Sequence, residues 1–386
     1  MSFDLHAGLA AREAAQLYRR RQLACSAQQP QRQFADADLL TFCSNDYLGL
    51  ANHPALAAAL ARGAERWGVG AGASHLLAGH SHAHHALEEE LAAAVGRPRA
   101  LLFSTGYMAN LGVLGALLDR DAVVFSDDLN HASLIDAARL SRARVERYAH
   151  VDLPGLERLL QGSEAARRLI VTDAVFSMDG DIAPLPQLSA LAARHGAWLL
   201  ADDAHGFGVL GAHGGGSAEL FKLDVDALPV LMGTLGKALG CFGAFVAGSE
   251  ALIETLIQQA RSYIYTTALP PALAEAARVA LHLAREESWR RDKLTSLIAH
   301  FCRGARQLGL PLLASSTPIQ PLLAGSAERA LAWSEHLRAH GLLVPAVRPP
   351  TVPAGTARLR IVLSAAHDEA QVDRLLLALE SMPGRG

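Results

Sequence analysis

The stretch Val230-Leu-Met-Gly-Thr-Leu-Gly-Lys-Ala-Leu-Gly240 is a short apolar run that ends in a lysine bracketed by glycines. A lysine held at a turn beside a strand end can be desolvated, which frees its amine to react with an aldehyde. Lys237 is therefore a candidate for holding pyridoxal phosphate. Upstream, Leu199-Leu-Ala-Asp-Asp-Ala-His-Gly206 offers a carboxylate that can keep a pyridine nitrogen protonated, and Asp202 is the candidate for that role.

The composition indicates a large globular protein that acts on small molecules. Its 386 residues are 51% hydrophobic and 19% charged, enough to bury a full core and to form one large and one smaller domain. The formal charge of −3 gives no basic field for nucleic acid or anionic lipid, apart from the local run Arg19-Arg20-Arg21. Four widely spaced cysteines without a Cys-x-x-Cys suggest neither a zinc site nor a disulfide framework: Cys25, Cys43, Cys241 and Cys302.

The start of the chain does not have the pattern of a secretory signal. Asp4, Arg12 and Glu13 fall within the first helical pattern, where a signal peptide has a basic start followed by an apolar block. A membrane span needs about 18 uninterrupted apolar residues, and the sequence contains no such run. We therefore expect a soluble, cytoplasmic protein.

Short apolar runs alternate with helical patterns from about residue 54 onward. The runs lie at 100–103, 122–125, 169–172, 198–201, 229–232 and 244–247. Strands separated by helices predict an α/β fold with a mostly parallel sheet flanked by helices. After residue 268 the pattern changes to a long helical stretch through residue 299, followed by weaker strands at 319–322 and 358–362.

These changes predict three parts of the chain. Residues 1–50 form an N-terminal arm with a polar amphipathic helix over 3–24 and an extended run at 39–43. Residues 51–274 form the large domain, and residues 275–386 form a smaller α+β domain at the C-terminus.

Ser104-Thr-Gly-Tyr107 follows the first strand of the large domain and opens a helix. Free backbone N–H groups at a helix N-terminus favour an anion such as a cofactor phosphate, and Gly106 would allow its close approach. The hydroxyl of Thr234, three residues before Lys237, could reach the same phosphate. The alternative is an ordinary strand-to-helix turn capped by a serine or threonine.

Other polar side chains follow neighbouring strands of the predicted sheet. His131, Ser177 and His205 lie in segments that converge outside the carboxyl ends of parallel strands, where ligands bind. The flat ring of His131 could stack on a planar cofactor and offer a hydrogen bond at neutral pH.

Four histidines close together suggest a metal site as an alternative. In Gly79-His-Ser-His-Ala-His-His-Ala-Leu-Glu88, His80 and His84 would share a helix face. No His-Glu-x-x-His motif is present, however, and the run Glu88-Glu-Glu90 is typical of a solvated helix face. We expect no functional metal here.

The sequence resembles the α-oxoamine synthases, a family of fold-type-I pyridoxal-phosphate transferases. The likeness covers nearly the whole chain, from Ser44-Asn-Asp-Tyr-Leu-Gly-Leu50 through Gly233-Thr-Leu-Gly-Lys237 to Gly355-Thr-Ala-Arg-Leu-Arg360. Two further strings are similar to the family member that acts in biotin biosynthesis: Phe176-Ser-Met-Asp-Gly-Asp181 and Arg348-Pro-Pro-Thr-Val-Pro-Ala-Gly-Thr-Ala-Arg358.

The resemblance implies a role for each matching residue. It makes Lys237 the Schiff-base lysine, Asp202 the partner of the pyridine nitrogen and His131 the residue that stacks on the ring. The further cofactor contacts that it implies are Gly106, Tyr107, Ser177, His205 and Thr234, with His205 also counted among the catalytic residues. The substrate contacts that it implies are Arg19, Asn45, His131, Thr351 and Arg360.

The resemblance also implies an assembly and a reaction. The family forms homodimers in which Thr266 or Thr267 of one chain reaches the phosphate in the other. The biotin-pathway member condenses L-alanine with a pimeloyl group carried by coenzyme A or acyl carrier protein, and releases carbon dioxide. In that reaction Arg360 is the expected partner of a carboxylate, because a guanidinium binds one through two parallel hydrogen bonds.

Two alternatives stay open on the sequence alone. Other members of the family use glycine with acetyl-CoA, glycine with succinyl-CoA, or serine with a long acyl thioester. A protein of a different class, a cofactor-free binding or metal protein, would use Lys237 only structurally.

Overall fold

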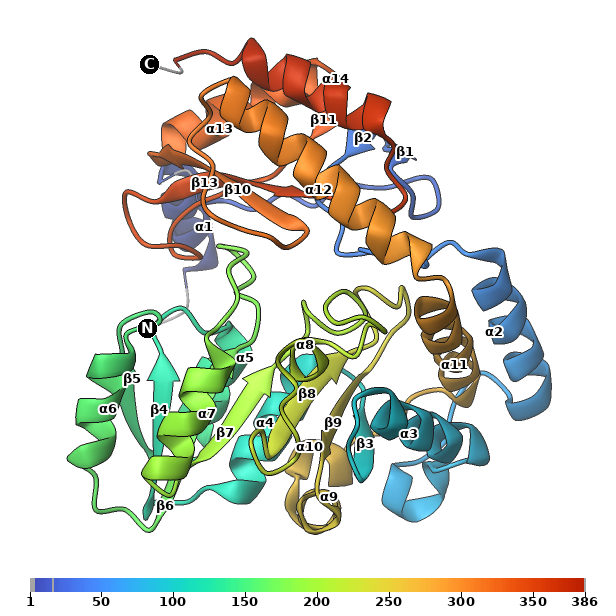
Figure 1. Ribbon diagram of the computed structural model, residues 1–386. Coiled ribbons are helices and arrows are strands. Elements are labelled where there is room, and N and C mark those ends of the chain that lie inside the picture. Colours follow the sequence, from blue (N-terminus) through green and yellow to red (C-terminus); the bar gives the residue numbers. More distant parts are fainter. Residues whose placement is uncertain (1–3, 16, 385–386) are drawn as a thin grey trace. The chain divides into compact units, whose positions relative to one another are not determined.

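The computed structural model describes residues 4–15 and 17–384, which divide into two compact units (Figure 1). One unit is Asn45–Thr295. The other combines the residues up to Ser44 with those from Ser296 onward, and the division between them falls within one helix, α12 (Trp289–Gln307). The domain boundaries at residues 50 and 274 rest on sequence patterns and stay a prediction.

A seven-stranded sheet forms the centre of the unit Asn45–Thr295, in the order β3-β9-β8-β7-β6-β4-β5. The strands are β3 Arg99–Phe103, β4 Ala122–Asp127, β5 Arg144–Tyr148, β6 Arg167–Asp173, β7 Trp198–Asp202, β8 Val230–Thr234 and β9 Ala244–Gly248. Only β9 pairs antiparallel with its two neighbours, and the remaining pairs are parallel. The mostly parallel sheet is therefore confirmed.

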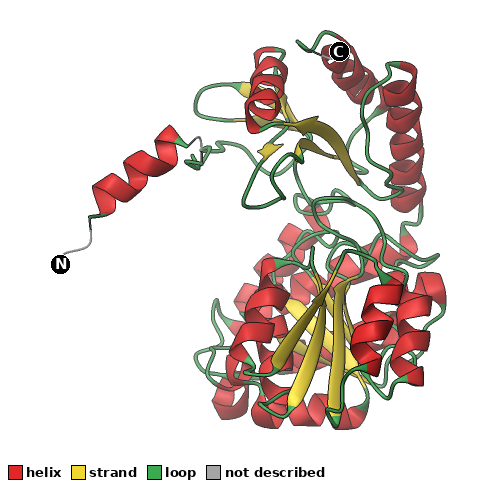
Figure 2. Ribbon diagram, turned by 90° about the vertical axis from the view of Figure 1, so that its left-hand side faces the viewer, coloured by secondary structure: helices red, strands yellow, loops and turns green. Residues whose placement is uncertain are grey.

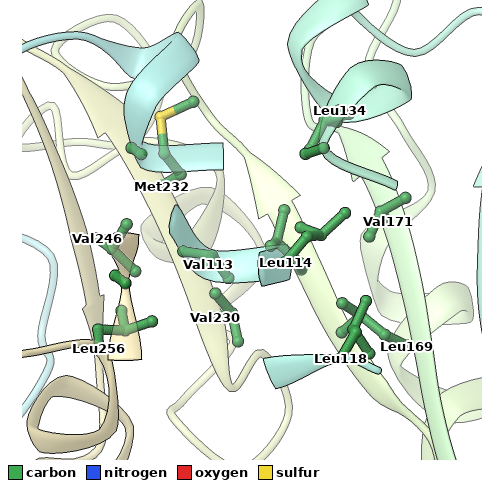
Figure 3. Close-up of a cluster of buried hydrophobic side chains, with 14 of the residues drawn as sticks. Val113, Leu114, Leu118, Leu134, Leu169, Val171, Val230, Met232, Val246 and Leu256 are labelled. Carbon is green, nitrogen blue, oxygen red and sulfur yellow. The ribbon is translucent and has the colours of Figure 1, made fainter. Parts of the chain in front are cut away.

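Apolar side chains pack on the sheet because its strands are buried on both faces. Alternate strand residues such as Leu169 and Val171 point to one face, into the same cluster of buried side chains as Val113 and Leu114 of helix α4 (Figure 3). Figure 2 shows helices on both sides of this sheet. The helices of the unit are α2 Pro54–Trp67, α3 His82–Ala94, α4 Gly106–Leu117, α5 Ala132–Leu140, α6 Leu153–Gln161, α7 Leu185–Arg194, α8 Ser217–Phe221, α9 Glu250–Gln259, α10 Arg261–Ile264 and α11 Pro271–Glu286, and a π-helical turn spans His75–Gly79.

All six predicted strands of this sheet are present, and one further strand, β5, was not predicted. β5 lies at the edge of the sheet, and only the last of its five residues, Tyr148, is buried. Its sequence Arg144-Val-Glu-Arg-Tyr148 therefore lacks the apolar run that marks the other strands.

The second unit carries two small sheets, ordered β1-β2-β11 and β10-β13-β12. Both strands predicted near the C-terminus are confirmed, as β10 Ile319–Gly325 and β13 Ala357–Val362, which pair antiparallel. The other elements are α1 Leu5–Ala14, β1 Gln31–Gln33, β2 Asp38–Thr41, α13 Ala327–Ala339, β11 Leu342–Leu343, β12 Ala346–Val347 and α14 Glu369–Glu380.

Two helix predictions were wrong in extent. The helix predicted over residues 3–24 is present only as α1, Leu5–Ala14, and the chain from residue 17 to 23 is not helical; residues 3 and 16 lie outside the described part. The long helical stretch after residue 268 is two helices, α11 and α12, separated at 287–288. Among the described residues, no helix is both long and apolar enough to cross a membrane.

Candidate active site

A cavity of about 240 Å³ lies at the carboxyl end of the seven-stranded sheet. Eight of the predicted site residues line it: Gly106, Tyr107, His131, Ser177, Asp202, His205, Thr234 and Lys237. Four further residues complete the wall: Ser133, Asp173, Ala204 and Met232. The sequence therefore predicted most of this cavity's lining.

The parallel strands bring these side chains together. Asp202 is the last residue of β7 and pairs in register with Asp173, the last residue of β6. Thr234 ends β8, the neighbouring strand, and the turn that follows carries Lys237. Because parallel strands end at one edge, the residues that follow them converge there.

Lys237 lies next to a chain of hydrogen-bonding groups. Its Nζ is 3.0 Å from Nε2 of His205, and Nδ1 of His205 is 2.6 Å from the hydroxyl of Tyr47. The Tyr47 hydroxyl also donates to Oδ1 of Asn45 at 3.2 Å. Asn45 does not line the cavity, but Tyr47 links it to His205. Tyr47 was missed as a site residue although it lies in Ser44-Asn-Asp-Tyr-Leu-Gly-Leu50, one of the strings that resemble the family.

The carboxylate of Asp202 is buried and fixed from two sides. Its Oδ1 accepts the backbone N–H of Ala204 at 3.1 Å, and its Oδ2 accepts Nδ2 of Asn110 at 2.8 Å. Asn110 is fully buried within α4 and was also missed, because an asparagine inside an apolar helical pattern gives no local sign of its partner. The side chain of Asp202 is thus held at the floor of the cavity, where a cationic ring nitrogen would find it.

A second carboxylate stands beside Asp202. Asp173 accepts the backbone N–H of His131 at 2.8 Å, which fixes the start of α5 against the sheet. Burial, together with the negative charge of Asp202, raises the pKa of Asp173 well above its ordinary value. The raised pKa favours the protonated form of Asp173 beside the Asp202 carboxyl group.

The N-terminus of α4 offers backbone donors to the cavity. The hydroxyl of Thr105 caps this helix by accepting the N–H of Met108 at 3.2 Å. The N–H groups of Gly106 and Tyr107 donate to no group of the described residues, and both residues line the cavity. The hydroxyl of Thr234 donates to the carbonyl of Gly243 at 3.0 Å, so it would have to rotate to reach an anion.

The remaining predicted residues do not line this cavity. Thr266 and Thr267 follow α10 in the same unit, and Thr267 forms a bridge with Ser74. Arg19 and Thr351 are exposed residues of the other unit. Arg360 is buried in β13 of that unit, opposite Pro321 of β10.

The histidines near residue 80 have protein partners. His84 caps α3 by accepting the N–H of Ser81 at Nδ1 (3.0 Å), and its Nε2 lies 2.5 Å from the carbonyl of Leu269. His80 precedes the helix, so the predicted shared face of His80 and His84 was wrong. Nδ1 of His75 is 2.9 Å from Nδ1 of His80, and its ring stacks on Tyr263. These contacts hold the segment that carries Thr266 and Thr267.

The predicted solvated face at Glu88 was also wrong. Oε1 of Glu88 accepts the backbone N–H of Leu102 at 2.9 Å, and burial raises the pKa of the Glu88 carboxyl to about 7. Burial and the neighbouring His84 and His85 lower the pKa of His80 to about 4. The ring of His80, whose Nε2 is 4.0 Å from Oε2 of Glu88, is therefore uncharged at neutral pH.

The donors around the cavity fit pyridoxal phosphate. Two unused N–H groups at a helix N-terminus suit its phosphate, and the fixed Asp202 carboxylate suits a protonated ring nitrogen. The amine of Lys237 faces the same space and suits its aldehyde. One cavity thus combines the three features that this cofactor requires.

Comparison with known proteins gives consistent results. A family model, aminotransferase class I and II, matches residues 37–379. An 8-amino-7-oxononanoate synthase from Stutzerimonas stutzeri is 61% identical over 98% of this chain and 96% of its own length. A serine palmitoyltransferase from S. paucimobilis with bound PLP–myriocin aldimine is 29% identical, covers 98% of this chain and 96% of its own, and superposes with a TM-score of 0.92. An 8-amino-7-oxononanoate synthase from Francisella tularensis is 32% identical, covers 89% of this chain and 97% of its own, and has a TM-score of 0.79.

Proposed function

The chain belongs to the aminotransferase class I and II family, and from this premise we propose that it condenses L-alanine with a pimeloyl thioester in biotin biosynthesis. The products are 8-amino-7-oxononanoate, carbon dioxide and the free thiol of coenzyme A or acyl carrier protein. Pyridoxal phosphate is the cofactor. One observation carries the assignment of the site: eight of the ten cofactor-contact residues expected from the sequence line a single cavity at the carboxyl edge of the sheet.

Pyridoxal phosphate, when bound, supplies an electron sink that stabilises negative charge on the carbon next to the amine of alanine. Asp202 would hold a proton on the pyridine nitrogen, and the positive charge of the ring would strengthen its attraction for electrons. The two oxygens of Asp202 are already oriented by hydrogen bonds from Ala204 and Asn110. The N–H groups of Gly106 and Tyr107 would bind the phosphate at the positive end of α4. These residues orient the cofactor and place charge around it.

Lys237 would perform the covalent attachment and the proton transfers. Its amine would hold the cofactor's aldehyde until alanine displaces it, and the released amine would then take the proton from the alanine Cα. His205, 3.0 Å from Nζ, and Tyr47 behind it fix the position of this amine. Ser177 and His205 would contact the polar substituents of the ring.

We propose four residues as contacts for the two substrates: Arg19, Asn45, Thr351 and Arg360. The hydrogen bond from Tyr47 to Asn45 supports this role, because the same hydroxyl contacts His205 in the cavity wall. Arg360 would bind a carboxylate through two parallel N–H groups, which is the geometry in which a guanidinium recognises a carboxylate.

We propose that the protein acts as a cytoplasmic homodimer, with residues 51–274 as its cofactor-binding domain. Thr266 or Thr267 would reach the phosphate in the partner subunit. Their position supports this, since neither lines the cavity of its own chain while both lie in a segment braced by His84 and Ser74.

The alternatives within the family are less well supported. The relative that makes 8-amino-7-oxononanoate is 61% identical, whereas the serine palmitoyltransferase with the same fold is 29% identical. Assays of alanine, glycine and serine against pimeloyl, acetyl, succinyl and palmitoyl thioesters test the assignment. We expect turnover with alanine and a pimeloyl thioester to exceed every other pair by at least about 100-fold, a difference of about 3 kcal/mol in activation free energy. Preference for glycine or serine would overturn it.

A further inference from the structure

The side chain of His131 is the N-cap of helix α5. Its Nδ1 accepts the backbone N–H of Ser133 at 3.2 Å, and the hydroxyl of Ser133 lies 2.7 Å from the same atom. A backbone N–H can only donate, so Nδ1 of His131 carries no proton. The proton of a neutral imidazole must then be on Nε2, which makes no hydrogen bond to any described residue.

The environment also disfavours the protonated, cationic form of His131. A second proton would have to enter at Nδ1, which faces a backbone donor at the positive end of α5. Burial lowers the pKa of His131; the charge of Asp202 opposes this effect, while Lys237 adds to it. The contacts of Nδ1 and this lowered pKa both favour a neutral His131 with its proton on Nε2.

A buried asparagine connects this histidine to the carboxylate on the cavity floor. Nδ2 of Asn110 donates one hydrogen to Oδ2 of Asp202 at 2.8 Å and the other to Oγ of Ser133 at 2.9 Å. Because Oγ of Ser133 accepts from Asn110, its own hydrogen is available for Nδ1 of His131. Asn110 and Ser133 are 0% and 1% exposed, so water does not compete for these bonds.

We propose that Asn110 and Ser133 are positioning residues that join Asp202 and His131 into one unit and hold His131 as the neutral Nε2–H tautomer. This inference rests on the proposed function, in which Asp202 and His131 contact the cofactor. His131 then acts as a hydrogen-bond donor through Nε2, suited to a carboxylate or carbonyl oxygen of the substrate. It does not transfer protons through Nδ1.

The tautomer can be measured directly by nitrogen NMR of the holoenzyme labelled with 15N-histidine. The His131 signals are identified by their loss in His131→Gln. We expect a protonated Nε2 and an unprotonated Nδ1 at neutral pH. A protonated Nδ1, or a doubly protonated ring at neutral pH, would overturn the proposal.

Variants test the connection. Ser133→Ala removes the hydroxyl and should lower kcat about 10-fold, the loss expected for one buried hydrogen bond, while Ser133→Thr should restore it. Asn110→Leu should lower kcat further, and adding Ser133→Ala to it should have little extra effect, because Asn110 holds both partners. If Asn110→Leu does not fold, the two Ser133 variants carry the test.

Ser141→Ala is the matched control, because Ser141 is a buried serine next to the other end of α5 whose hydroxyl donates to Ala138 at 2.7 Å. It should leave the His131 signals and kcat unchanged. Unchanged His131 signals and kcat in Ser133→Ala and Asn110→Leu would contradict the proposal. Failure of the proposed function is distinct, because the wild-type protein would then lack pyridoxal phosphate or turnover of alanine with a pimeloyl thioester.

Discussion

The amine of Lys237 lies 3.0 Å from Nε2 of His205. The other ring nitrogen of His205 lies 2.6 Å from the hydroxyl of Tyr47, which donates to Asn45. Since that hydroxyl gives its hydrogen to Asn45, it accepts from Nδ1–H of His205, which leaves Nε2 to accept from the lysine. The residue expected to carry the chemistry is thus placed by a row of hydrogen bonds that ends in the turn before α2.

Tyr47→Phe should therefore affect catalysis more than substrate binding. The change removes the acceptor for Nδ1–H of His205, which costs about 1.5 kcal/mol and lowers kcat about 10-fold. Steady-state kinetics should show this loss with little change in the KM for alanine. A variant with the wild-type kcat would show that Tyr47 does not position His205.

Asp202→Asn should separate cofactor binding from catalysis. An amide keeps the size of the side chain but cannot hold the ring nitrogen protonated, so kcat should fall about 100-fold or more, equivalent to about 3 kcal/mol. The bound pyridoxal phosphate, measured by absorbance and by release in alkali, should stay near one per chain. Native kcat in the fully loaded variant would contradict the charge argument.

Glu88→Gln should stabilise the protein at alkaline pH. The pKa of Glu88 is about 7 in the folded chain, against an ordinary value of 4.5, because burial disfavours its charge. The folded state thus binds more protons than the unfolded state between these values, and stability falls as pH rises through that window. At pH 8 the free energy of unfolding of the glutamine variant should exceed that of the wild type by about 3 kcal/mol, and at pH 4.5 the difference should be small.

Urea titrations at both pH values measure this difference. Glu89→Gln is the control, since Glu89 is the exposed neighbour on the same helix. Equal stability of Glu88→Gln and the wild type at pH 8 would mean that the carboxyl of Glu88 is not desolvated.

His150 should cause a further loss of stability with rising pH, in a window above that of Glu88. Burial alone would lower its pKa, but hydrogen bonds to Asp127 at 3.1 Å and to Asp181 at 3.0 Å raise it to about 10. The protonated His150 stabilises the folded state through these two carboxylates. This contribution is complete below the unfolded pKa of about 6.5 and is lost as pH rises toward 10. Between pH 6.5 and 10 the wild type should lose on the order of 2 kcal/mol after solvent screening.

His150→Gln should abolish this loss, as measured by urea unfolding at pH 6.5 and pH 9.5. His282→Gln is the control, because His282 is exposed and only 2.9 Å from the exposed Glu286. If the free energy of unfolding of His150→Gln depends on pH as that of the wild type does, the ion pairs of His150 with Asp127 and Asp181 are not the cause of the loss.

The central sheet was predictable because its strands are buried on both faces. A fully buried strand such as β4 or β6 reads as a continuous apolar run, and this pattern does not depend on distant partners. The edge strand β5 has no such run, since most of its side chains face solvent. The helix predicted over 3–24 failed at its C-terminal half, which contains the exposed run Arg19-Arg20-Arg21.

Site residues were predictable where they belong to local motifs that follow strands. They were not predictable where their hydrogen-bond partners are distant in the sequence. Lys237, Asp202 and His131 each sit in a local string that suggests chemistry. Asn110, by contrast, lies in an apolar stretch of α4 and reaches Asp202 across 92 residues of sequence. Glu88 looked solvated because its neighbours are glutamates, yet its burial is set by β3, which no local pattern reveals.

Reduction of the holoenzyme with borohydride, followed by peptide mapping, tests the central claim most directly. The chain has three lysines, at positions 222, 237 and 293, so the position of the tag is unambiguous. We predict a reduced pyridoxyl group on Lys237 alone, and none in Lys237→Ala. A tag on Lys222 or Lys293, or on no lysine, would contradict the account.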